Sequence, residues 1–99
     1  MKIPDKVKVA GQVYKIKWDD ERLSERGFVG ETDHNLNIIF LCKCYHSKQA
    51  SAKSEIEETL LHEIVHAIDV NYNNHALNED QVTRLSIGLY QVLKDNFKF

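Results

Sequence analysis

The chain has 99 residues, of which 42% are hydrophobic and 28% charged, and its formal net charge is −2. These values fit a single folded domain over residues 1–99 and exclude a disordered, collagen-like or low-complexity chain. No basic excess favours binding to nucleic acid, and no apolar run is long enough to cross a membrane. Because the amino terminus lacks the apolar stretch of a secretory signal, we expect a cytoplasmic protein.

The first half of the chain has the alternating pattern of β-strands. Lysines alternate with apolar residues on both sides of Gly11, which predicts a hairpin. A polar loop follows, with one helical turn expected around Leu23. Two further strands are predicted over 28–32 and 36–44, joined by a turn that contains Asp and Asn. We therefore expect a small antiparallel sheet of three or four strands.

The second half has the period of α-helices. Apolar residues recur every three or four positions from Ile56 to Ile68, and the pattern stops at an Asn-rich segment over 71–74. A second helix is predicted to begin at Asn78, with Gln81 completing a capping box. Its buried residues are expected to be Val82, Leu85, Leu89, Val92 or Leu93, and Phe97, with a close helix crossing at Gly88. The predicted fold class is therefore α+β, a small sheet followed by two packed helices.

The first of these helices contains a HExxH motif formed by His62, Glu63 and His66. Because four residues make about one helical turn, both imidazoles project from one face and can bind a single metal ion. Imidazole nitrogen suits Zn²⁺, and the glutamate of such a motif serves as a general base toward a metal-bound water. The alternative is an amphipathic helix with two solvent-exposed or hydrogen-bonded histidines.

A catalytic zinc site needs a third protein ligand. The metzincin class is excluded because Tyr72 occupies the position of its third histidine. Asp69 shares the helical face of His66 and is better placed to orient a ligand than to bind the metal. Glu79 opens the second helix, which can fold back and present it to the metal. Glu79 and the following Asp80 are equally explained by the preference of acids for a helix N-terminus.

The runs EETLLHEIVHAID and NEDQVTRLSIGLYQVLKDN resemble small phage and prophage HExxH proteins. These are minimal gluzincin-type, metallopeptidase-like domains, distantly related to the ImmA/IrrE group. The resemblance is sharp over residues 55–96 and loose over the strands. It implies a minimal zincin-like fold with zinc bound by His62, His66 and Glu79, and Glu63 as the catalytic acid/base.

Further candidates lie around this motif. Tyr72 or His75 could supply the hydrogen bond that stabilises the oxyanion of a tetrahedral intermediate. Cys42, Cys44 and His46 share one strand face and have zinc-compatible donor atoms, although cysteine is often a small buried hydrophobe. This stretch is not part of the family pattern, and a second metal site is the less favoured interpretation.

The leading functional hypothesis is a zinc-dependent peptidase-like hydrolase that cleaves amide bonds. Its expected partner is a protein or peptide substrate, added as a strand along the sheet edge at 36–44. The alternative is a non-catalytic structural or protein-binding module of phage origin, in which zinc only holds the two helices together. A site of that kind would be closed by four protein ligands.

Overall fold

The computed structural model describes residues 1–45, 49–50 and 52–98 and has an α+β fold. The chain begins with the predicted hairpin, formed by β1 (Lys6–Val9) and β2 (Gln12–Trp18). Ala10 and Gly11 form its turn, both with positive φ, a conformation that suits glycine. The expected helical turn around Leu23 is α1 (Asp20–Arg26), which ends at Gly27 in the left-handed conformation.

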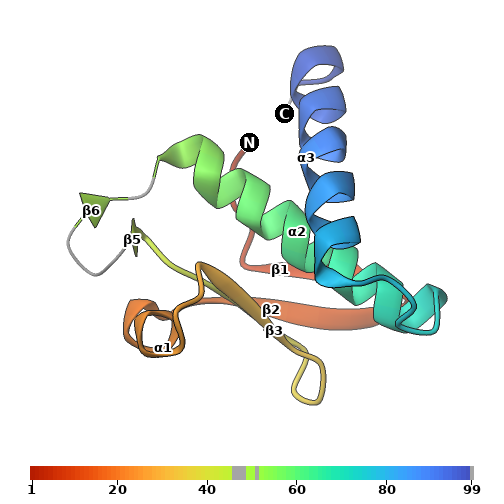
Figure 1. Cartoon of the computed structure of the whole chain (residues 1–99), viewed down its shortest axis with the longest axis horizontal. Helices are drawn as coiled ribbons and strands as arrows, with labels where there is room; N and C mark the ends of the chain where they lie inside the picture. The colour runs from red at the N-terminus through yellow and green to blue at the C-terminus, as the bar shows by residue number, and fades with distance from the viewer. Residues whose placement is uncertain (46–48, 51, 99) are drawn as a thin grey trace.

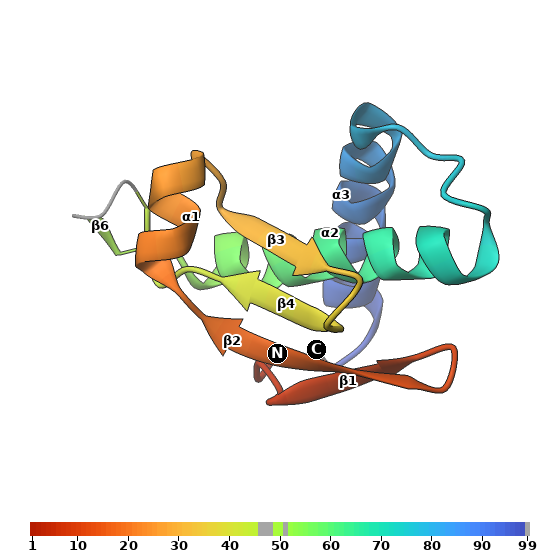
Figure 2. The same cartoon turned by 90° about the horizontal axis from the view of Figure 1, so that it is seen from below.

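A four-stranded sheet is completed by β3 (Gly30–Asp33) and β4 (Ile38–Leu41), in the order β1-β2-β4-β3 (Figure 2). Two pairings are antiparallel, but β2 and β4 are parallel, so the sheet is mixed and the expectation of a purely antiparallel sheet is wrong. The chain passes through α1 and β3 before β4 enters between β2 and β3. The four residues of β4 are all apolar, and an inner position buries such a strand on both sides.

The interior position of β4 corrects a second expectation. Residues 36–44 were expected to offer a free sheet edge, but Ile38–Leu41 pair with β2 on one side and with β3 on the other. The outer strand on this side is β3, which has no neighbour beyond it among the described residues. The strands β5 (Cys44–Tyr45) and β6 (Gln49–Ala50) form a separate short pair.

Two long helices follow the sheet. The motif helix α2 (Lys53–Tyr72) lies across one sheet face, and α3 (Glu79–Asn96) crosses α2 (Figure 1). The predicted capping box of α3 is present: the Asn78 side chain accepts from the Gln81 backbone, and the Gln81 side chain accepts from the Asn78 backbone. None of the described helices is long and apolar enough to span a membrane.

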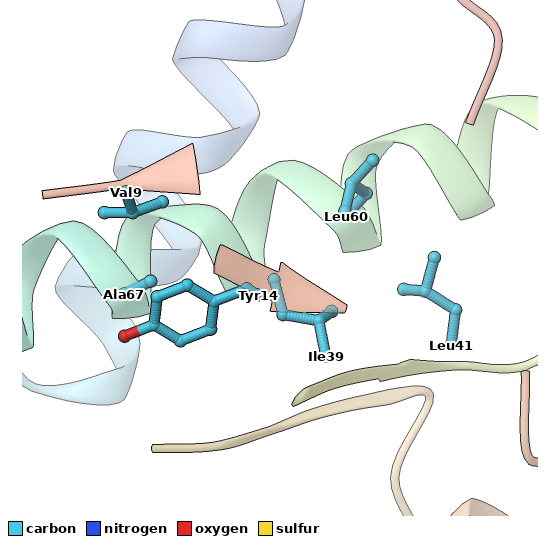
Figure 3. Close-up of a cluster of buried hydrophobic side chains, with 6 residues drawn as sticks. All are labelled: Val9, Tyr14, Ile39, Leu41, Leu60 and Ala67. Atoms are coloured by element: carbon cyan, nitrogen blue, oxygen red, sulfur yellow. The ribbon is translucent and has the colours of Figure 1, made fainter. Parts of the chain in front are cut away.

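The main core lies between the sheet and α2. Tyr14, Ile39 and Leu41 point from the sheet toward Leu60 and Ala67 of α2, as Figure 3 shows. On the opposite face of the sheet, a smaller cluster forms where Leu23 of α1 packs with Phe40 and Cys42. Alternate residues of β4 thus enter different clusters, as a period of two requires.

The buried face of α3 differs from the predicted one. Its buried residues are Val82, Ser86 and Tyr90, whereas the predicted stripe is largely solvent exposed: Leu85 (54%), Leu89 (38%), Val92 (45%) and Phe97 (63%). The predicted close crossing at Gly88 is also wrong, because a Cβ there would have no atom within 4 Å. Two polar side chains, Ser86 and Tyr90, take the buried positions because each finds a hydrogen-bond partner.

Candidate metal centre

The two motif histidines and Glu79 converge at the crossing of α2 and α3. Nε2 of His62 lies 2.6 Å from Oε1 of Glu79, and Nε2 of His66 lies 2.9 Å from Oε2 of the same carboxylate. The two Nε2 atoms are 3.2 Å apart. The structure therefore brings together the two histidines, one helical turn apart, and a carboxylate from the start of the next helix.

This donor set fits Zn²⁺. Ligand atoms about 2.0–2.1 Å from a tetrahedral zinc lie roughly 3.3 Å apart, and one ligand atom from each of the three residues falls within 4.8 Å of the other two. The Glu79 carboxylate is closer than this to both imidazoles, as a hydrogen-bonded acid would be. Burial lowers the pKa of His66, and the neighbouring His62 lowers it further, against the opposing effect of Glu79. A low pKa favours the neutral imidazole that binds metals.

Ser86 orients the first histidine. Its Oγ donates to the Thr83 carbonyl at 3.0 Å and lies 3.5 Å from Nδ1 of His62. With its proton committed to Thr83, this hydroxyl is left as an acceptor for an Nδ1–H. A His62 tautomer protonated at Nδ1 would use this acceptor and leave the Nε2 lone pair for a metal ion.

Glu63 lies beside the ligand group in a protected position. It is only 5% solvent exposed, and the Thr32 hydroxyl of β3 donates to its Oε1 at 2.8 Å. A Cβ on Gly30 of the same strand would lie 3.2 Å from Glu63 Oε2 and 2.5 Å from Cγ2 of Thr59. Glycine at position 30 therefore allows β3 to approach α2 closely at this point.

Burial raises the pKa of Glu63 to about 7, which means that desolvation outweighs the opposing effects of the Thr32 hydrogen bond and of His62. The carboxylates of Glu79 and Glu31 also raise it. A carboxyl group with a pKa near 7 can both accept and release a proton at neutral pH, which is the property needed in a general acid/base.

A groove of about 750 Å³ opens beside these residues. It runs between the start of β3, α2 and α3, and its lining includes His62, Glu63 and Glu79. The ligand group is thus accessible from the solvent, unlike a structural site enclosed on all sides.

Asp69 is buried and supports the connection between the two helices. Its Oδ1 accepts from the Asn73 side chain at 2.9 Å and from the Leu77 backbone at 3.2 Å. These hydrogen bonds and the charge of His75 hold the pKa of Asp69 below its usual range, even though burial acts to raise it. Asp69 makes no hydrogen bond to either motif histidine among the described residues. Asp69 therefore acts indirectly on the metal centre, by holding the segment that leads to Glu79.

The two candidates for oxyanion binding lie apart from the groove. Tyr72 is 70% exposed, and its side chain makes no hydrogen bond to any described residue. His75 is exposed, and its ring centroid lies 6.5 Å from that of His34. Neither Tyr72 nor His75 lines the groove. Burial lowers the pKa of His34, with His66 and His75 adding to the effect, so this half-buried turn histidine favours its neutral form.

The cysteine-rich stretch gives no second cluster among the described residues. Cys42 is buried under α1, and its Sγ donates to the Val29 carbonyl at 3.3 Å. The Cys44 side chain and His46 lie outside the described part of the chain. The candidate site at 42–46 therefore stays a prediction.

Sequence reasoning missed three supporting residues of the centre: Gly30, Thr32 and Ser86. Each acts through a contact between distant segments, so no local pattern in the sequence marks it. No family model, curated protein or solved structure matches this chain. The geometry of the centre and the groove therefore carries the functional argument.

Proposed function

We propose that this chain is a zinc-dependent, peptidase-like hydrolase of amide bonds, with zinc held by His62, His66 and Glu79 and with Glu63 as general base. One observation carries the proposal: the three donor residues converge, and two of them, His62 and Glu79, line an open groove together with the buried Glu63. In line with the resemblance to phage and prophage proteins, the proposal places the protein in the cytoplasm of a bacterial host.

When bound, zinc would lower the pKa of a coordinated water and polarise the substrate carbonyl. Glu63 accepts the proton of the attacking water, and its raised pKa lets it pass that proton to the departing amine. Thr32 fixes one oxygen of this carboxylate, so that the carboxylate keeps one orientation through both transfers. Ser86 lies 3.5 Å from Nδ1 of His62 and would accept from the tautomer that leaves Nε2 for the metal.

The proposed substrate is a peptide segment in extended conformation. Because β3 is the outer strand beside α2 in the described part of the chain, its outer edge replaces 36–44 as the place where a substrate strand would add. Gly30 and Thr32 of this strand both approach Glu63, so a strand added here lies close to the general base.

The second candidate is a zinc-stapled module without catalysis. It is favoured by the fact that the three donors come from two helices, because a metal bound there would join α2 to α3. Metal removal would then unfold the domain, and Glu63 would have no role.

Untagged protein should be purified and its zinc content measured, in parallel with the Glu63→Gln and His62→Ala variants. Hydrolysis is then assayed on a mixture of peptides by mass spectrometry. We expect one zinc per chain in the wild type and in Glu63→Gln, none in His62→Ala, and cleavage by the wild type alone. A wild type without zinc would refute the metal site. Zinc binding with cleavage equal to that of Glu63→Gln would favour the zinc-stapled module.

A further inference from the structure

The groove extends well beyond the residues that the proposed chemistry uses. Gly30 of β3 faces Thr59, and Thr32 faces Glu63, so β3 and α2 run side by side in the same direction. The segment before β3 therefore lies level with the first turns of α2. Phe28, Val29, Glu55 and Glu58 line this far part of the groove.

The walls of this part are apolar and exposed. Phe28 is 52% and Val29 43% exposed on the sheet side, and Ile87 of α3 is 48% exposed on the other. All three line the groove, so a side chain placed between them would bury apolar surface on both sides. Burying a Leu or Phe side chain in this way is favourable in proportion to the area removed from water.

The floor of this part is acidic. Glu55 and Glu58 line the groove, and no Lys or Arg is among its lining residues. Glu58 is half-buried, and neither acid forms an ion pair with any described residue. A half-buried carboxylate such as that of Glu58 attracts a cationic side chain more strongly than one in open water.

The spacing of these features matches an extended peptide. Glu58 lies one helical turn before His62, about 6 Å along the axis, and Glu55 lies about 10.5 Å before it. A strand advances about 3.3 Å per residue, so these acids lie level with its second and third residues from the metal. Phe28 and Val29, which precede Gly30, lie level with these acids on the sheet side of the groove.

We propose that the substrate is an extended peptide with a bulky apolar residue and a lysine or arginine within about three residues of the cleaved bond, both on the same side of it. The apolar side chain packs between Phe28, Val29 and Ile87, and the basic side chain reaches Glu55 or Glu58. This inference rests on the proposed hydrolase function, and it names the substrate class of the same site.

The test begins with cleavage of a proteome-derived peptide library by zinc-loaded wild type, with Glu63→Gln as the blank. We expect Leu, Ile or Phe, together with Lys or Arg, to be enriched within about three residues on one side of the cleavage sites. The double variant E55K/E58K should lower kcat/KM for lysine-containing peptides about three- to tenfold and favour glutamate-containing ones. The matched control is E21K/E25K on α1, which places the same charges outside the groove.

Two variants of α3, one inside the groove and one outside it, test the apolar walls. Ile87→Ala should reduce the preference for a bulky over a small residue about tenfold. Leu85→Ala, equally exposed but outside the lining, should leave the preference unchanged.

Binding separates this inference from the proposed function. Zinc-loaded Glu63→Gln is titrated with a labelled lysine-containing peptide and with its glutamate counterpart. A three- to tenfold preference for lysine without any wild-type cleavage would support this recognition and refute hydrolysis. Cleavage without the apolar-basic pattern, or with an E55K/E58K profile equal to that of E21K/E25K, would refute the inference while the hydrolase function stands. Neither cleavage nor preferential binding would refute both.

Discussion

The hydroxyl of Thr32 donates a 2.8 Å hydrogen bond to Oε1 of Glu63, joining the outer strand β3 to the motif helix α2. It is a contact between residues 31 positions apart in the sequence. The bond acts on the group proposed as general base. It partly offsets the effect of burial, and the resulting pKa of Glu63 is about 7. The position of β3 therefore influences the pKa of Glu63.

Replacing Thr32 with valine should weaken catalysis without loss of zinc. Removing the hydrogen bond leaves the Glu63 carboxylate less stabilised, so its pKa rises further and less base is present at pH 7. We expect a threefold to tenfold lower kcat/KM at pH 7 and a pH–rate profile whose acid limb moves to higher pH. Thr32→Ser keeps the hydroxyl and should restore both. An unchanged pH profile in Thr32→Val would contradict this role.

Glu79 and Asp80 offer a matched pair at the start of α3. Glu79 contacts both motif histidines, whereas Asp80 pairs with Arg84. Glu79→Ala should weaken zinc binding by more than the roughly 10- to 100-fold typical of lost outer contacts, measured by competition with a chelator. Asp80→Ala should leave the zinc affinity unchanged. Equal affinities in the two variants would exclude Glu79 as a ligand.

Asp69 should affect the metal centre through the helix connection. Asp69→Ala removes the acceptor of the Asn73 and Leu77 hydrogen bonds, so the segment before Glu79 loosens. We expect faster hydrogen exchange at the Leu77 amide and about 10- to 100-fold weaker zinc binding. Faster exchange together with unchanged zinc affinity would show that the connection does not position Glu79.

Relative to Glu63→Gln, the metal-free protein should lose stability as the pH rises from about 4.5 to 7. Glu63 has a higher pKa folded than unfolded, so the folded state binds more protons between about pH 4.5 and 7. Stability attributable to this group is full at low pH and is lost as the pH rises through this window. Relative to Glu63→Gln, the chelated wild type should lose up to about 3 kcal/mol between pH 4 and 8, measured by denaturant unfolding. If the difference in unfolding free energy between the two proteins stayed constant from pH 4 to 8, the raised pKa of Glu63 would be contradicted.

Two glycines give opposite predictions for the same substitution. Gly30→Ala places a Cβ 2.5 Å from Thr59 Cγ2, which should destabilise the fold by about 1–3 kcal/mol. Gly88→Ala has open space around the Cβ and should stabilise α3 by about 1 kcal/mol. Thermal unfolding measures both, and the double variant G30A/T59A should recover much of the loss. A destabilising Gly88→Ala would mean that another surface covers this position.

The sequence by itself determined the local features. The spacing of His62 and His66 places both imidazoles on one helical face, and Asn78 with Gln81 specifies where α3 begins. Leu23 marks a short helix between strands. These features depend on residues only a few positions apart, and backbone geometry fixes their relation whatever surrounds them.

Only the tertiary structure decided which segments meet. The apolar run of β4 favours an inner strand, but it does not say which strands lie on either side of it. Nor does a local pattern show that Ser86 and Tyr90, and not Leu85 and Leu89, face α2. Strand order depends on which strand gains most from burial on both sides, and the buried face of α3 depends on which polar groups find partners. The convergence of Glu79 with the motif histidines follows from the resulting helix crossing. The residue types that can bind a metal could be identified from the sequence. Their assembly with Thr32 and Glu63 beside one groove depends on contacts between residues far apart in the chain.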